Sequence, residues 1–141
     1  MLAFDRRQPP PQDWADRYVE EHHWATAAVP RDRLVELNIQ AMDYFTARYP
    51  LSWAPGYLHS RLGTDLHDHP AYKVGYAPPG WTHLVDHLRR RGASDDELLA
   101  AGLANRATSG RLYDVFRDRL LLPVKQADTG EIVAFIARRN P

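Results

Sequence analysis

The segment from Gly110 to Val124 is where residue types and spacing point most clearly to chemistry. Arginines stand at odd positions and large apolar residues at even ones: Arg111, Arg117 and Arg119 against Leu112, Phe116 and Leu120. An extended chain alternates its side chains between two faces, so this spacing predicts one basic face opposite a buried one. Guanidinium groups bind phosphate in a planar, bidentate way, and such a face suits a sugar–phosphate backbone. The alternative is a structural network in which Asp114 and Asp118 neutralise the arginines.

Histidines form a second candidate site. The segment His67–His69 places two histidines around an aspartate, with His59 upstream. In an extended segment, alternating imidazoles can share a metal ion. The alternative is a polar loop with solvent-exposed imidazoles. His83 and His87 are spaced four apart but lack the glutamate of a zincin motif, and they fit equally well beside the apolar stripe of a helix.

Composition excludes several classes of function. The chain has 141 residues and no cysteine, which rules out disulfides, a thiol nucleophile and cysteine-ligated metals. Lys+Arg and Asp+Glu both number 18, so any basic surface must be local. No phosphate-binding glycine loop, nucleophile elbow or paired-metal carboxylate motif is present. There is no secretory signal and no apolar run of about 20 residues, so we expect a cytoplasmic protein without a membrane partner.

Helical periodicity identifies the elements that must position these residues. A helix is predicted from Arg31 to Tyr49, with apolar residues at steps of three and four: Leu34, Leu37, Ala41, Phe45 and Tyr49. Shorter helices are predicted over residues 12–26, Ser52–Leu62 and Trp81–Arg91, with Tyr57, Leu58 and Leu62 on the apolar side of the second. A capping box at Ser94 starts another helix.

Strands are predicted mainly in the second half of the chain. Residues 71–76 alternate like a short strand, and the β-rich segments Arg119–Gln126 and Glu131–Arg138 flank a hairpin turn at residues 127–130. The sequence therefore predicts an α+β domain, with N-terminal helices followed by a small mixed or antiparallel sheet. The chain ends at Pro141 directly after a strand, and we expect the full-length protein to continue.

The turn Pro78–Gly80 is predicted to redirect the chain so that Trp81 enters the core beside Leu84 and Val85. Loss of a buried tryptophan costs about 3–5 kcal/mol. We therefore expect Gly80→Ala or Trp81→Ala to damage folding more than binding.

Several short motifs occur in one order along the chain. They are Tyr57-Leu58-x-x-Arg61, Val74-Gly75-Tyr76-Ala77-Pro78-Pro79-Gly80-Trp81, Gly110-Arg111-x-Tyr113-Asp114-x-Phe116-Arg117-x-Arg119, Pro123-Val124, and Gly130 with Ala134-Phe135 through Arg138. This order resembles the N-terminal subdomain (TOPRIM-N) of the catalytic core of bacterial DnaG-type DNA primases, over residues 31–139. In that family the subdomain precedes a TOPRIM fold, which supplies the metal-binding carboxylates for RNA primer synthesis.

The resemblance implies a role for five arginines in binding nucleic acid. Arg61 is similar to the basic residue of the family's Tyr-Leu-x-x-Arg-Gly motif, and Arg117 and Arg119 match its Phe-Arg-x-Arg pair. Arg111 follows the family's glycine, and Arg138 matches the arginine after Gly-Gly. We expect Arg61, Arg117, Arg119 and Arg138 to converge on one groove wall, with Arg111 joining them.

The chain also departs from the family pattern. Leu62 separates Arg61 from Gly63, and Ile136 and Ala137 stand where the family has Gly-Gly. Residues 1–30 match nothing in the pattern and are expected to be an extension, with the primase-like subdomain at residues 31–141.

The resemblance predicts a nucleic-acid-binding subdomain of a primase-like protein, which holds single-stranded DNA or an RNA–DNA hybrid beside a TOPRIM catalytic half. Its partners are that TOPRIM domain in the same protein and, additionally, a replicative helicase. No cofactor is expected in this chain; Mg²⁺ or Mn²⁺ is expected only with a TOPRIM half, so the isolated chain should not synthesise primers. The alternative is a protein-interaction module that docks a helicase or relaxase.

Overall fold

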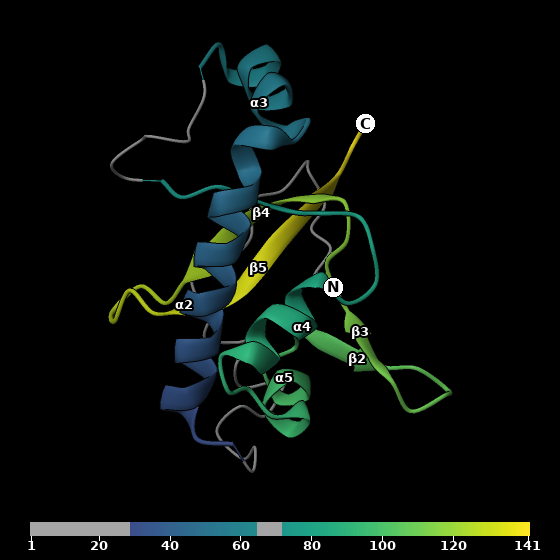
Figure 1. The fold of residues 1–141 in the computed structure, drawn as a ribbon. Coiled ribbons are helices and arrows are strands. Elements are labelled where there is room, and N and C mark those ends of the chain that lie inside the picture. The colour runs from purple at the N-terminus through teal and green to yellow at the C-terminus, as the bar shows by residue number, and fades with distance from the viewer. Residues whose placement is uncertain (1–28, 65–71) are drawn as a thin grey trace.

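The computed structural model describes residues 29–64 and 72–141, and this part of the chain has the expected α+β arrangement (Figure 1). Its elements in chain order are α2 (Arg31–Arg48), the 3₁₀ helix η2 (Tyr49–Leu51), α3 (Ala54–Leu62), β1 (Gly75–Ala77), α4 (His83–Arg90), α5 (Asp95–Ala100), β2 (Ala104–Arg106), β3 (Leu112–Asp114), β4 (Arg119–Lys125) and β5 (Ile132–Arg139). The helix predicted at residues 12–26 and the segment His67–His69 lie outside the described residues.

Two antiparallel sheets form the β part. The larger has the strand order β1-β4-β5, and the smaller is the β2–β3 hairpin. Helix α2 runs along the molecule against β1 and β5, with α3 at one end and α4 and α5 towards the other. The β2–β3 hairpin projects from the body at the end away from α3 (Figure 1). The strand β2 is an element that the sequence analysis missed.

The apolar stripe of α2 is buried as its spacing predicts. Its five members, Leu34, Leu37, Ala41, Phe45 and Tyr49, are all fully buried. Phe45 meets Phe116 and Phe135 edge-on, with ring centroids 6.3 and 5.6 Å away. Asn38 ties α2 to β5, because its side-chain amide donates to the Ile132 carbonyl at 2.9 Å. Helix α3 also forms as predicted and ends at Gly63, whose φ is 73°, but Leu62 is exposed rather than packed.

Gly75 brings β1 unusually close to α2. A Cβ atom placed on this glycine would lie 2.5 Å from the Cβ of Phe45 and 3.1 Å from its carbonyl carbon. Both contacts are shorter than van der Waals packing allows, so only glycine lets the strand approach the helix this closely.

Replacing Gly75 by alanine is expected to lower the free energy of unfolding by about 1–3 kcal/mol, because strand or helix must move to admit the methyl group. Urea denaturation followed by circular dichroism measures the change. Gly56→Ala is the matched control: Gly56 lies in α3 with open space at its Cβ position, and alanine there should be neutral or stabilising by up to about 1 kcal/mol. Equal stabilities of Gly75→Ala and the unmodified chain would show that the close approach is wrong.

Candidate nucleic-acid interface

Tyr57 lies between two arginines that are far apart in sequence. Residues 57 and 61 stand one helical turn apart on α3, so their side chains share a face. The Arg61 guanidinium lies 5.6 Å from the centre of the Tyr57 ring, and that of Arg138, from β5, lies 4.9 Å away. The ring of Trp53 meets Tyr57 edge-on at 5.9 Å. These four residues are called the Tyr57 cluster.

Trp81 forms a second group with Tyr113 and Arg117, called the Trp81 cluster. The Arg117 guanidinium lies 3.8 Å from the centre of the Trp81 ring and 5.5 Å from that of Tyr113. The side chain of Trp81 is 65% exposed, so the prediction that it enters the core is wrong. The turn before α4 does redirect the chain, but it buries Leu84 and Val85 and leaves Trp81 on the surface under Arg117.

Asp114 holds both the start of α4 and the backbone of Trp81, two residues before that helix. Its carboxylate accepts hydrogen bonds from the backbone amides of Leu84 at 3.0 Å and Val85 at 2.9 Å, which a helix end otherwise leaves unpaired. Its own backbone amide donates to the Trp81 carbonyl at 2.7 Å. Burial raises the pKa of Asp114, while the two amide bonds oppose the rise. The proposed pairing of Asp114 with arginine is therefore wrong.

The carboxylate of Asp118 accepts hydrogen bonds from two aromatic side chains. Its carboxylate accepts from the indole Nε1 of Trp53 at 2.9 Å and from the hydroxyl of Tyr76. These two hydrogen bonds lower the pKa of Asp118, and burial together with the hydrogen bond to Asp118 raises the pKa of Tyr76 to about 12. The charge of Arg119 lowers the pKa of Asp118 further, so Asp118 offsets that arginine, although its carboxylate hydrogen bonds go to Trp53 and Tyr76.

The predicted common face of Arg111, Arg117 and Arg119 is wrong because the segment is not one strand. The chain leaves β3 after Asp114 and re-enters a strand only at Arg119. The apolar half of the prediction is confirmed, since Leu112, Phe116 and Leu120 are buried. The basic half fails because Asp118, with φ of 50°, interrupts the extended conformation between Arg117 and Arg119.

The structure brings some of the five predicted arginines together. Arg61 and Arg138 meet at Tyr57, and Arg117 lies on Trp81. The Nη1 of Arg119 donates to the carbonyls of Arg117 at 2.7 Å and Asp118 at 3.0 Å, so this side chain braces its own turn. Arg111 lies in the turn of the β2–β3 hairpin, away from α3.

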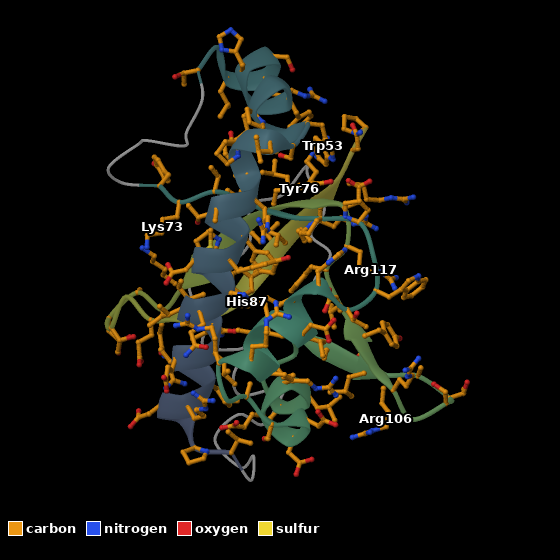
Figure 2. All side chains as sticks on the ribbon, in the orientation of Figure 1. Trp53, Lys73, Tyr76, His87, Arg106 and Arg117 are labelled. Carbon is orange, nitrogen blue, oxygen red and sulfur yellow. The ribbon has the colours of Figure 1, made fainter. Side chains whose placement is uncertain are left out.

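Residues 117–119 connect the two clusters. Asp118 is bound to Trp53 of the Tyr57 cluster, and its neighbour Arg117 belongs to the Trp81 cluster. Figure 2 shows Trp53, Tyr76 and Arg117 along one side of the molecule, with Lys73 on the opposite side. We call the two clusters together with residues 117–119 the arginine–aromatic surface.

Two guanidinium nitrogens on this surface are hydrogen-bond donors without an acceptor. Among the described residues, Arg117 Nη1 and Arg138 Nε are shielded from water and lack a hydrogen-bond partner. Buried donors of this kind favour a bound acceptor, and those on a cation favour an anionic one. The exposed ring of Trp81, beside Arg117, and the half-buried ring of Tyr57, beside Arg138, are aromatic groups against which a planar group can stack.

Trp53 is a member of this surface that no pattern in the sequence indicated, whereas Tyr57 and Tyr113 belong to the family motifs but were given no binding role. The spacing of Tyr57 and Arg61, four apart on a predicted helix, was the available signal for one contact. Tyr113 and Arg117 are also four apart, but in a segment predicted to be extended.

The described residues contain neither a candidate metal centre nor a membrane-spanning helix. In residues 29–64 and 72–141, no three histidine, aspartate or glutamate side chains lie together to hold a metal ion. The proposed ligands His67 and His69 lie outside these ranges, so that alternative stays a prediction. None of the described helices is long and apolar enough to cross a membrane.

Comparison with known proteins defines the class of this domain. Residues 49–140 match the family described as the DNA primase catalytic core, N-terminal domain. The DNA primase of Deinococcus radiodurans is 40% identical over 111 residues, which are 78% of this chain and 19% of that protein. The DNA primase of Mycolicibacterium smegmatis is 38% identical over 112 residues, 77% of this chain and 17% of that one. The chain belongs to the family of DNA primase catalytic-core N-terminal domains, and the resemblance seen in its motifs is confirmed.

Solved structures of primases share the fold. The RNA polymerase domain of Mycobacterium tuberculosis primase DnaG, in complex with double-stranded DNA, matches with a TM-score of 0.70 and 35% identity, over 78% of this chain and 35% of that one. A DnaG primase catalytic domain bound to single-stranded DNA matches with a TM-score of 0.65 and 26% identity, over 77% of this chain and 36% of that one. The chain thus spans about a fifth of these primases' length and about a third of the solved chains.

Proposed function

We propose that this chain is the nucleic-acid-binding subdomain of a DNA-primase-like protein, which holds single-stranded template or primer–template beside a TOPRIM catalytic half. The observation that supports it best is the arginine–aromatic surface. Arg61, Arg117 and Arg138 each lie over an aromatic ring there, an arrangement that combines phosphate binding with base stacking. The DNA-bound primase domains with the same fold support the same proposal.

The dependence of binding on salt tests this function. Fluorescence anisotropy with a labelled thymidine oligonucleotide should show weak binding, with a dissociation constant of about 10⁻⁴–10⁻⁶ M, because only one wall of the site is present. The logarithm of the binding constant should fall steeply with the logarithm of salt, by about 0.7 for each phosphate contact. Absence of oligonucleotide binding, or binding with no salt dependence, would contradict the proposal. If the folded chain then binds a replicative helicase, the protein-interaction module is favoured instead.

Trp81→Ala separates a stacking role from a structural one. Because the side chain is mostly exposed, we expect the free energy of unfolding to change by less than about 1 kcal/mol. We also expect oligonucleotide binding to weaken by about 1–3 kcal/mol, the contribution of one stacked base. Urea denaturation and anisotropy measure the two quantities. A large loss of stability with unchanged affinity of the folded chain would contradict the stacking role.

The described residues do not form a binding site for the metal ions of primer synthesis, because no suitable group of carboxylates lies together among them. We therefore assign no chemical step to this chain, and Mg²⁺ or Mn²⁺ belongs to the TOPRIM half of the proposed whole protein. The isolated 141 residues are expected to make no primer from nucleoside triphosphates with either metal.

A further inference from the structure

Asp118 has a backbone conformation that its residue type rarely adopts. Its φ of 50° makes it the single non-glycine residue with positive φ among those the structure describes. Aspartate and asparagine tolerate this left-handed region better than other side chains, but glycine is the usual choice. Such a residue persists only where its surroundings hold it in place.

The side chain of Asp118 is held from two separate elements. One carboxylate oxygen accepts from Trp53, directly before α3, and from the hydroxyl of Tyr76, in β1. The two donor rings pack edge-on, 5.9 Å apart. The backbone amide of Asp118 donates to the Pro78 carbonyl at 3.3 Å, in the turn that leads to Trp81.

The arginines on either side of Asp118 take different directions. Arg117 lies over Trp81, with its guanidinium carbon 3.8 Å from the ring centre. Arg119 turns back onto the carbonyls of residues 117 and 118. In an extended chain the two side chains would point to one face, so the left-handed residue between them is what separates them.

We propose that Asp118 is a positioning residue of the arginine–aromatic surface: its carboxylate, held by Trp53 and Tyr76, locks the turn that places Arg117 on Trp81 for nucleic-acid contact. This inference rests on the proposed function, because it concerns how well Arg117 meets a phosphate. Nucleic acid need not touch Asp118 itself.

Comparison of Asp118→Asn with Asp118→Gly tests the proposal. Both substitutions remove the same negative charge and both tolerate positive φ. Only asparagine keeps an oxygen that can accept from Trp53 and Tyr76. We expect Asp118→Asn to bind the thymidine oligonucleotide about tenfold more tightly than Asp118→Gly, and with a salt slope larger by about 0.7, one phosphate contact. Circular dichroism establishes the folded fraction of each variant at the assay temperature.

Tyr76→Phe provides a second variant that leaves charge and backbone unchanged. It removes one donor to the Asp118 carboxylate and should reduce the salt slope in the same direction as Asp118→Gly. The positioning role would be overturned if Asp118→Asn and Asp118→Gly bound the oligonucleotide with the same affinity and salt slope, and if Tyr76→Phe bound it like the unmodified chain. A different result would contradict the proposed function itself: unchanged oligonucleotide binding by the double variant Arg61→Glu, Arg117→Glu.

Discussion

Replacing Arg61 and Arg117 together by glutamate is expected to weaken oligonucleotide binding by about 100-fold at low salt. Each change removes a charge-assisted phosphate contact and adds a repelling carboxylate. The two positions belong to different clusters, so their joint effect reports on the whole arginine–aromatic surface. Arg119 is left unchanged, because its guanidinium braces the turn at Asp118. Anisotropy at several salt concentrations measures both the affinity and the salt slope.

The matched control reverses Arg89 and Arg90 at the end of α4. It changes the net charge of the chain by the same amount but lies outside the arginine–aromatic surface, and Arg89 already pairs with Asp95 at 2.7 Å. We expect the control to weaken binding only slightly. Equal weakening by both pairs would mean that diffuse positive charge, and not this surface, binds the nucleic acid.

Asp114→Ala is expected to lower the free energy of unfolding by about 3 kcal/mol. The substitution leaves the buried amides of Leu84 and Val85 without an acceptor, and each unpaired buried donor costs about 1–3 kcal/mol. Urea denaturation measures the loss. Asp114→Asn keeps one acceptor oxygen and should lose less. Stability of the alanine variant close to that of the unmodified chain would contradict the role assigned to this carboxylate.

The stability difference between the unmodified chain and Asp114→Asn should also depend on pH. Burial raises the folded-state pKa of Asp114 above its value in the unfolded chain. The stability linked to its proton is therefore fully present below the unfolded pKa, about 3.9, and is lost as pH rises through the folded pKa. We expect the advantage of aspartate over asparagine to shrink as pH rises across that window. If the stability advantage of Asp114 over asparagine grew with pH, the pKa of Asp114 in the folded chain would be lowered and not raised.

Local signals account for the elements that the sequence predicted well. The stripe of α2 repeats at helical spacing over five buried residues, and the Ser94 capping box starts α5, with both of its hydrogen bonds present. The β4–β5 hairpin follows from two β-rich segments around a short turn. The strand β2 was missed because it has only three residues, two of them exposed and polar, and pairs only with β3.

Contacts between distant residues account for the errors at the site. Trp81 was assigned to the core on its apolar character, but its position depends on Asp114, which lies some thirty residues later and binds the start of α4. The common arginine face failed because Trp53 and Tyr76, more than forty residues before Asp118, hold that residue in a left-handed turn. No local pattern records either contact. Arg111, Arg117 and Arg119 follow from their spacing as well as from the family resemblance, Arg61 and Arg138 follow from the resemblance, and the role of all five in binding nucleic acid remains a prediction.

Photocrosslinking tests most directly whether the Tyr57 and Trp81 clusters form one nucleic-acid-binding surface. The chain would be bound to a single-stranded oligonucleotide carrying 5-iodouracil and irradiated, and the crosslinked residues would be identified by mass spectrometry. We predict crosslinks at Trp81 and Tyr57, the aromatic residues beneath Arg117 and Arg61. Crosslinks confined to the hairpin turn at residues 107–111, or to the C-terminal end of α4 with Arg89 and Arg90, would contradict this surface.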